Sequence, residues 1–571
     1  MKNLKAQFKL IIYIVIFFSS YSILQAKNFN KFEKADKLSS YFSGIISIAN
    51  HDYENSYKFL KKLNGLEDSH YQFINSFQQS LINLDRINEA LKYSKNLESK
   101  NLDNFESNLI IGIYYLKNEN INKAKEYFTK LNKDKDLNLL QELLYQSLSS
   151  WASISGIKDI EVALNLMENF PERFKNIKRI QKLFIHCHYD SIDTEKIFND
   201  LLFDSTTDLS RYYFFYSNYF LQKGNNLKAK KILNIALKKY PRNLLLNQLK
   251  IDINLNNNLT DQFKCQNIAE VVGEIFYITA NALAATNNYT ASNFYLNLAN
   301  YLNPKFSSFE TLSAENLFAM KKLTKAKKIY KKIKKKGIVY DWHASKQITF
   351  ILEEENKSEE ALEYLSEVYD KILKPTIFNT YDFAEFLKRN EKFKESIIYY
   401  SEVIGKINKE HHLYTKATFG RGIAFERINQ WEKSEVDLLN SLSVLPNQPY
   451  VINYLAYSWI EKGINISKSL KLLEKANNLK NKDGYIIDSL GWALFKLKKY
   501  KEAKKYLEQA VIFMPSDPVV NDHFGDVLWM NNNTLQARYY WNYVLNLEET
   551  DEELKNKIKN KLVLGLNTKN L

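Results

Sequence analysis

The sequence predicts an all-α protein, a superhelical solenoid in which pairs of antiparallel helices stack along one continuous core. Three observations predict this class. A pattern of small and apolar residues recurs about every 34 residues, and such internal repetition marks stacked supersecondary units. The chain of 571 residues contains only 15 Gly and 8 Pro, as expected for helices joined by short turns. Apolar residues make up 45% of the chain, enough for about fourteen helix pairs to bury a core.

Residues 1–26 have the composition of a secretory signal. Lys2, Lys5 and Lys9 precede an uncharged stretch, 10–26, that ends on the small residue Ala26. We therefore expect export to the periplasm, with cleavage after Ala26. An uncleaved membrane anchor is the alternative, because the uncharged stretch approaches the ~17 to 25 residues of a membrane span. The boundary has no cysteine, which excludes lipid attachment there.

Residues 27–272 read as degenerate repeats. A unit of this kind has a small residue where its first helix meets its second. Three such positions are clear in this part of the chain, and three more are weaker candidates. The clear ones are Gly44, Gly112 and Ser217, and the weaker ones are Gln78, Trp151 and Phe184. A gap of 63 residues before Ala280 leaves room for one more degenerate unit around 243–259.

Residues 273–547 read as a regular array. The small positions follow one another at intervals of 34, 35, 35, 38, 34, 35 and 34 residues, and they are Ala280, Ala314, Thr349, Ala384, Gly422, Ala456, Gly491 and Gly525. Glycine inside a helix costs roughly 1 kcal/mol relative to alanine. We therefore expect close helix packing to offset that cost at Gly491 and Gly525.

The best preserved unit resembles a tetratricopeptide repeat (TPR). Its match to the pattern W-x2-L-G-x2-Y, A-x3-F, P consists of Ile487, Leu490, Gly491, Leu494, Ala503, Leu507 and Pro515. Residues 548–571 follow the last unit as a capping helix and tail. Thr550 and Glu553 have capping-box spacing, and charged residues should cover the outer side of that helix.

The C-terminal part of the chain, 442–571, resembles one group of TPR proteins more closely. "DSLGWAL", followed one unit later by "DHFGDVLW", is similar to the large exported TPR proteins of Gram-negative bacteria. That group includes the lipoprotein adaptor of a periplasmic carboxy-terminal processing protease. The resemblance implies a scaffold that brings protease and substrate together. This chain departs from the adaptor in lacking a cysteine at the cleavage boundary.

The resemblance also implies a concave groove lined by first-helix positions 2, 5, 9, 12 and 13, with the small residue counted as position 8. The candidate partner-binding residues on these positions are Tyr450, Asn453, Tyr457, Tyr485, Asp488, Trp492, Phe495, Asp522, Asp526 and Trp529. Such a surface suits a peptide or helix with basic or aromatic anchors. Asp488 and Asp522 replace the Lys and Asn of a carboxylate clamp. Alternatively, the aspartates are solvated, and Trp492 and Trp529 pack between neighbouring first helices.

No catalytic motif, cofactor-binding loop or metal-ligand spacing is present, which predicts a protein without chemistry of its own. His186 and His188 flank Cys187, but adjacent helical residues cannot all face one metal ion. His411 and His412 lie between repeats and should be exposed. Cys187 and Cys265 are 78 residues apart, about two units, so we expect both to be unbonded and buried.

The formal net charge of +15 includes a run of ten lysines between Lys321 and Lys336. These lysines suit the solvated face of a second helix. They also leave open a structural role in the cell envelope through anionic lipid or glycan, or nucleic-acid binding by a helical repeat. The export signal argues against nucleic acid. The sequence therefore predicts a non-enzymatic periplasmic scaffold that binds a protein partner.

Overall fold

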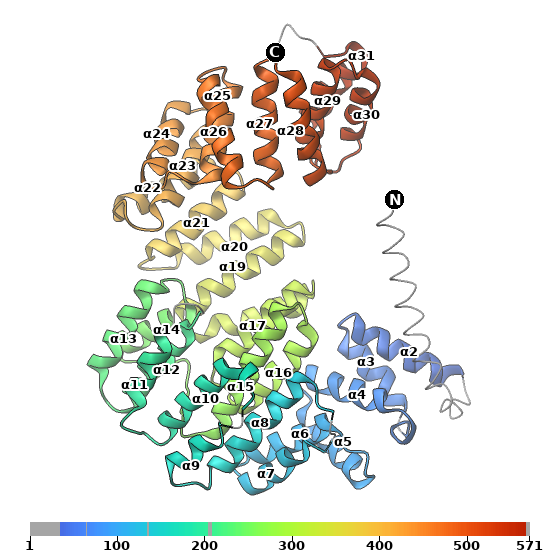
Figure 1. Ribbon diagram of the computed structural model, residues 1–571, viewed down its shortest axis with the longest axis vertical. Helices are drawn as coiled ribbons and strands as arrows, with labels where there is room; N and C mark the ends of the chain where they lie inside the picture. Colours follow the sequence, from blue (N-terminus) through green and yellow to red (C-terminus); the bar gives the residue numbers. More distant parts are fainter. Residues whose placement is uncertain (1–34, 64, 134–135, 169, 204–207, 567–571) are drawn as a thin grey trace. The chain divides into compact units, whose positions relative to one another are not determined.

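The computed structural model describes residues 35–63, 65–133, 136–168, 170–203 and 208–566. Within these ranges the chain forms 30 α-helices and short 3-10 turns, and no strand (Figure 1). The chain divides into two compact units, unit 1 ending at Lys357 and unit 2 starting at Ser358. The all-α solenoid is confirmed. The expected signal, 1–26, lies outside the described residues, and the change to regular repeats at residue 273 remains a prediction.

Unit 1 consists of helices that follow one another through short turns. They are α2 (Ala35–Ala49), α3 (Tyr53–Leu60), α4 (Tyr71–Asn83), α5 (Ile87–Ser99), α6 (Phe105–Lys117), α7 (Ile121–Lys130), α8 (Leu139–Ile154), α9 (Ile160–Asn165), α10 (Lys175–His188), α11 (Thr194–Leu202), α12 (Ser210–Gln222), α13 (Asn226–Lys239), α14 (Leu244–Leu255), α15 (Ile268–Ala285), α16 (Tyr289–Leu302), α17 (Ser307–Ala319), α18 (Leu323–Ile333) and α19 (Ile338–Glu354).

Unit 2 continues the same alternation. Its helices are α20 (Ser358–Asp370), α21 (Ile377–Arg389), α22 (Phe393–Lys406), α23 (Tyr414–Arg427), α24 (Trp431–Val444), α25 (Pro449–Glu461), α26 (Ile466–Leu479), α27 (Gly484–Lys496), α28 (Tyr500–Phe513), α29 (Pro518–Met530), α30 (Thr534–Val544) and α31 (Glu552–Leu564).

The backbone confirms the predicted register of the regular repeats. In every regular unit, a residue with positive φ ends the first helix seven residues after the small position. These residues are Asn287, Lys321, Asn356, Glu391, Asn429, Gly463, Lys498 and Asn532. At one such turn the N–H of Lys499 donates to the carbonyl of Leu494 at 2.9 Å, closing the helix end. Asn356 also confirms the placement of Thr349, which the sequence supports by spacing alone.

Packing explains the small residues. A Cβ at Gly491 would lie 2.7 Å from Cγ of Leu507, and one at Gly525 would lie 2.5 Å from the indole of Trp541. Each large side chain comes from the second helix of the same unit. The two helix backbones therefore approach too closely for a side chain at these positions, and burial of Leu507 and Trp541 offsets the cost of glycine.

The degenerate part of unit 1 follows the register less regularly. Asp85 has positive φ seven residues after Gln78, as in a regular unit, whereas Asp190 lies seven residues after Leu183 and shifts that unit one residue from Phe184. The degenerate unit expected around 243–259 is present as α14. It lacks a second helix, because a non-helical segment leads from α14 to α15.

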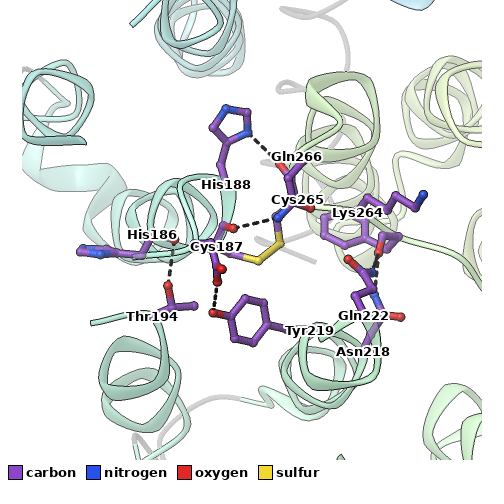
Figure 2. The surroundings of a disulfide bond; sticks show 12 residues. His186, Cys187, His188, Thr194, Asn218, Tyr219, Gln222, Lys264, Cys265 and Gln266 are labelled. Carbon is purple, nitrogen blue, oxygen red and sulfur yellow. Dashed lines mark hydrogen bonds between the residues drawn. A yellow bond between two sulfur atoms is a disulfide. The ribbon is translucent and has the colours of Figure 1, made fainter. Parts of the chain in front are cut away.

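That segment corrects the prediction for the cysteines. Cys187 of α10 and Cys265 form a disulfide, with their Cα atoms 5.7 Å apart (Figure 2). His188 Nδ1 lies 3.1 Å from the carbonyl of Cys265, and Gln266 Nε2 donates to the carbonyl of Cys187 at 3.2 Å. Complete helix pairs between the two residues would have kept them apart. The missing second helix lets the chain turn back to α10 instead.

In unit 1, hairpins bury their faces against distant hairpins as well as against adjacent ones, which a simple stack of repeats does not predict. Helix α16 packs against α4 and α6, and α15 packs against α6 and α8. Asn297 Nδ2 donates to the carbonyl of Ile82 at 2.9 Å, and Lys117 Nζ donates to that of Leu302 at 2.9 Å. One hydrophobic core runs from Tyr41 to Phe309. Unit 1 is therefore a solenoid that closes on its own later helices.

A buried ion pair lies inside this core. Arg211 of α12 donates from Nε and Nη2 to the two carboxylate oxygens of Glu274 on α15, both at 2.6 Å. Glu274 is fully buried, and the guanidinium lies 3.8 Å from the ring centroid of Tyr277. Among the described residues, α15 is also the one helix long and apolar enough to cross a membrane by length and composition, with 56% of that window buried.

The end of unit 2 departs from the predicted capping box by one residue. Asp551 is the N-cap of α31, and its Oδ1 accepts from the N–H of Leu554 at 2.7 Å. Thr550 is buried and donates to the carbonyl of Val544 at 2.6 Å instead. The expected capping helix is present. Ile558 places one fully buried side chain in the core of the last repeats.

Candidate protein-binding groove

The ten predicted groove residues lie on the first helices α25, α27 and α29 of three consecutive units (Figure 1). Their exposure follows their place along the helix. Tyr450 and Tyr485, at the helix starts, are 47% and 58% exposed. The partly buried members are Asn453, Tyr457 and Trp529, and the buried ones are Asp488, Trp492, Phe495, Asp522 and Asp526.

Trp492 packs between neighbouring first helices, as the alternative interpretation proposed. Its ring stacks on His523 of α29 with centroids 3.9 Å apart, and on Phe495 at 4.7 Å. Its indole N–H donates to Oε1 of Glu461 at 2.6 Å. Trp492 thus joins α25, α27 and α29, and its polar atom is satisfied within the chain.

Asp488 has an internal partner as well. His523 Nδ1 lies 3.0 Å from Oδ2 of Asp488, and both side chains are buried. Burial lowers the pKa of His523, but Asp488, Asp522 and Asp526 together outweigh burial and raise it above the usual value. The imidazolium form is therefore favoured beside Asp488.

Asp522 and Asp526 bind a lysine of the chain's own last helix. Lys561 Nζ donates to Oδ1 of Asp522 at 2.6 Å and to the two oxygens of Asp526 at 2.7 and 2.9 Å. Trp541 Nε1 donates to Asp526 Oδ1 at 3.0 Å. Burial, together with Asp522, raises the pKa of Asp526 to about 7. Burial lowers the pKa of Lys561, but the two aspartates leave it above the usual value.

The chain after Lys561 covers Trp529. Gly565 has a φ of +77°, which favours glycine, and a Cβ there would overlap the indole of Trp529. Three of the predicted groove residues, Asp522, Asp526 and Trp529, are therefore in contact with the C-terminal segment. This end of the groove is not an open acidic surface in the structure.

The exposed part of the site is apolar and lies at helix ends. Tyr450, Tyr485 and Val519 occupy the same place in consecutive first helices, and Leu445, Leu479 and Phe513 recur one repeat apart at the ends of second helices. We call these six residues the rim: Leu445, Tyr450, Leu479, Tyr485, Phe513 and Val519. All are 43% to 58% exposed. Equivalent positions of stacked repeats lie along one edge of a solenoid, so the rim extends over four consecutive units, from α24 to α29.

A sequence match supports the repeat register. A family model described as "Tetratricopeptide repeat" matches residues 489–511, which run from α27 into α28. The chain therefore contains a tetratricopeptide repeat there, and we call the helix pairs in the same register the TPR array.

The relatives of this TPR protein are distant. A TPR repeat-containing protein of Pseudomonas aeruginosa is 29% identical over 108 residues, which are 19% of this chain and 18% of that protein. The alignment thus spans less than a fifth of the relative's length. It relates a few repeats of the two chains and not the whole proteins.

Solved structures align with the chain at low sequence identity. The APC/C hetero-tetramer Cut9–Hcn1 aligns at 13% identity over 92% of this chain and 97% of its own, with a TM-score of 0.37. A tetratricopeptide repeat protein from Parabacteroides merdae aligns at 14% over 50% and 97%, with a TM-score of 0.33. YrrB, described as a TPR protein with an unusual peptide-binding site, aligns at 13% over 34% and 97%, with a TM-score of 0.26.

The lysine run of the TPR array is partly neutralised. It occupies α18 and the turn after it, and Lys332 and Lys336 both pair with Glu310. Lys321 pairs with Glu354 at 2.6 Å. Four lysines remain exposed and form no ion pair within the described part of the chain: Lys325, Lys328, Lys331 and Lys335.

The histidines singled out in the sequence lie on α10 and in the turn before α23. His186 and His188 point in different directions in Figure 2, His186 contacting Ser191 at 2.7 Å. Within the described ranges no group of three or more His, Cys, Asp or Glu side chains could hold a metal ion. His412 is exposed and His411 is partly buried, their rings stacked at 4.5 Å.

Sequence reasoning missed His523 and Lys561. The signal for Lys561 was present, because Tyr457, Trp492, Asp526 and Lys561 follow one another at intervals of 35, 34 and 35 residues. Lys561 thus has position 9 of one further repeat. Treating 552–564 as a cap with charges facing outward concealed this.

Proposed function

We propose that this TPR protein is a non-enzymatic scaffold of the periplasm that binds a protein partner along unit 2. The rim supports this proposal most directly. Six apolar side chains at recurring places across four consecutive repeats stay 43% to 58% exposed, although the repeats bury most of their other apolar residues. Exposed apolar patches of this kind mark interaction sites, and aromatic residues supply much of interface energy.

Two observations favour the periplasm. Residues 1–26 have the composition of an export signal. In addition, Cys187 and Cys265 are bonded, and disulfides persist mainly in oxidising compartments. We further propose that the partner is a processing protease or one of its substrates. The similarity of the C-terminal part, 442–571, to exported adaptors supports that choice.

Site-specific photocrosslinking in living cells tests the proposal. A crosslinking amino acid at Tyr485, which is 58% exposed on the rim, should capture a partner that mass spectrometry identifies. The matched control is Tyr539, which is 68% exposed on α30 and outside the rim. Equal adducts at both positions, or none at either, would contradict binding at the rim. Adducts without any protease or protease substrate would contradict the adaptor role alone.

A substitution series measures the rim's contribution. Tyr450→Ala combined with Tyr485→Ala should weaken capture at least about tenfold, because each aromatic anchor contributes on the order of 1 to 2 kcal/mol. Tyr539→Ala should leave capture unchanged. An unchanged affinity in the double variant would remove the rim from the interface.

The lysine-rich face supports a second candidate function, binding of anionic lipid or glycan as an envelope component. Lys325, Lys328, Lys331 and Lys335 are exposed without an ion pair in the described chain, and they project from one side of α18 and the turn after it. Cosedimentation with phosphatidylglycerol vesicles should then fall with salt and be lost when all four become Gln.

A matched control distinguishes this face from general positive charge. The control replaces four exposed lysines of α13 with Gln, namely Lys230, Lys231, Lys238 and Lys239. Equal losses in both variants would mean that vesicle binding reflects net charge and would exclude a specific lipid-binding face.

A further inference from the structure

Helix α31 has the register of the first helix of a further repeat. Lys561 lies 35 residues after Asp526, the same interval that separates equivalent positions of complete units. Helix α31 places Lys561 against Asp522 and Asp526 of α29, and it ends where Gly565 meets Trp529. It therefore packs against α30 and covers Asp522 and Asp526 of α29, two of the predicted partner-binding residues.

The contact is built around one ammonium group. Three carboxylate oxygens lie within 2.9 Å of Lys561 Nζ, and the side chains of Asp522 and Asp526 are 12% and 4% exposed. Trp541 walls the site, with its ring centroid 5.9 Å from Nζ. Two buried carboxylates this close together repel each other unless a cation lies between them or one of them takes up a proton. The ammonium ion is therefore the group that lets both aspartates stay ionised in this pocket.

The rest of α31 is held by few contacts. Of its 13 residues, all described, Ile558 is the one that is fully buried. Leu554 and Leu562 are partly buried against the core, while Val563 and Leu564 are 77% and 82% exposed. Leu554, Ile558, Lys561 and Leu562 fall on one helical face. The docked element is thus a short amphipathic helix with three apolar contacts and one lysine.

We propose that the end of the groove formed by α29 and α30 is a receptor for a lysine-bearing amphipathic helix, and that α31 is its resident, intramolecular occupant. The inference rests on the proposed protein-binding function. The partner helix carries a lysine with apolar residues seven and three positions before it and one position after it, as α31 does. It gains access by displacing α31, which its short tether keeps at a high local concentration.

Binding of α31 in trans tests this on the full-length chain. The probe is a labelled peptide of residues 551–566, followed by fluorescence anisotropy. In the Lys561→Gln chain the resident helix loses its ammonium, so the peptide should bind at least tenfold more tightly than to the wild-type chain. Adding Asp522→Asn and Asp526→Asn should abolish the gain, and a peptide with Gln at position 561 should not bind.

A measurement on the wild-type chain does not depend on that variant's folding. Hydrogen exchange of residues 552–564 should accelerate when excess peptide is added, while α27 stays protected. Unchanged peptide affinity in Lys561→Gln overturns the proposal. Hydrogen exchange of α31 that occurs only together with that of α27 also overturns the proposal, because α31 then never leaves its site on its own.

Two further outcomes separate the alternatives. If the wild-type chain is a dimer and the peptide dissociates it, the pocket binds α31 of a second copy. That result would overturn the proposal that a different protein supplies the helix. If the peptide binds as expected but the crosslinker at Tyr485 captures no partner, the proposed function is refuted. The receptor site for α31 would still be supported, because the peptide assay requires no natural partner.

Discussion

Reduction of the disulfide should lower the free energy of unfolding of unit 1 by about 4 kcal/mol. The bond joins residues 78 apart in the sequence. For a closed loop of that length the chain-entropy relation gives about 0.6 kcal/mol from its constant term and about 3.9 kcal/mol from its logarithmic term. Part of that total is lost where the unfolded chain retains structure, which leaves about 4 kcal/mol.

The folded state should survive reduction. Cys187 and Cys265 are 1% and 4% exposed, and reduced thiols add no buried charge at neutral pH. Asn218 and Gln222 also donate to the carbonyl of Phe263 at 2.5 and 2.6 Å, so hydrogen bonds hold the segment beside α12 (Figure 2). The stability difference should therefore arise mainly in the unfolded chain.

The assay is hydrogen exchange at increasing urea concentrations, with and without dithiothreitol. Peptides from α10 and α15 report on unit 1, and peptides from α27 provide an internal control in unit 2. Titration of free thiols in the untreated protein establishes that the bond is present. Identical urea midpoints for α10 before and after reduction would refute the entropic reasoning, and an equal shift in α27 would show an effect unrelated to the bond.

Three further predictions concern packing and charge. Gly491→Ala should destabilise unit 2 by about 1 kcal/mol net, because overpacking outweighs the gain in helix propensity. Gly405→Ala has open space around its Cβ and should stabilise unit 2 by up to about 1 kcal/mol. Thermal denaturation checks both variants. Arg211→Met should cost about 3 to 5 kcal/mol by leaving Glu274 buried without a cation, and adding Glu274→Leu should recover most of the loss in urea denaturation. Because the pKa of His523 is raised, the folded chain binds this proton more tightly than the unfolded chain does. The stabilisation from protonated His523 is complete below pH 6.5 and is lost as pH rises through the folded pKa, so the stability advantage of wild type over His523→Gln should shrink from pH 6.5 to 8.5. A constant difference would contradict this.

The repeat register was predictable because it is a local property. Each small residue, such as Gly491, requires a large partner from the same hairpin, and each turn requires one residue with positive φ at a fixed distance. Both constraints act within a single repeat, so the sequence pattern carries them directly. Even Thr349 could be placed by spacing, since Asn356 follows it at the expected interval.

The disulfide and the self-closure of unit 1 were not predictable in that way. Both depend on how many complete pairs lie between two segments and on how strongly the stack curves. The repeat unit that begins with α14 lacks a second helix. The repeat spacing of the sequence does not indicate that the following residues turn back to Cys187. Likewise, α16 reaches α4 because small rotations between neighbouring repeats accumulate along the stack. The sequence of a single repeat does not determine this total curvature.

The candidate site stays a prediction as a binding groove, but its occupancy differs from the expectation. The family's groove positions pointed to Asp522 and Asp526, and the structure pairs both with Lys561. What the sequence reasoning could not supply was their occupancy, because it treated 552–564 as a cap and not as a helix in register. Burial and ion pairing of an aspartate depend on which side chain comes next in the stack, here Lys561.

The closure of unit 1 has a consequence for how such a chain changes over generations. In an open stack, a repeat can be duplicated or deleted without disturbing more than its two neighbours. Between α4 and α16 this freedom is lost, since one hairpin more or less would move Asn297 away from Ile82 and uncover an apolar face. Unit 1 is therefore constrained to a fixed count of hairpins, while changes in length and binding range can accumulate after Ser358.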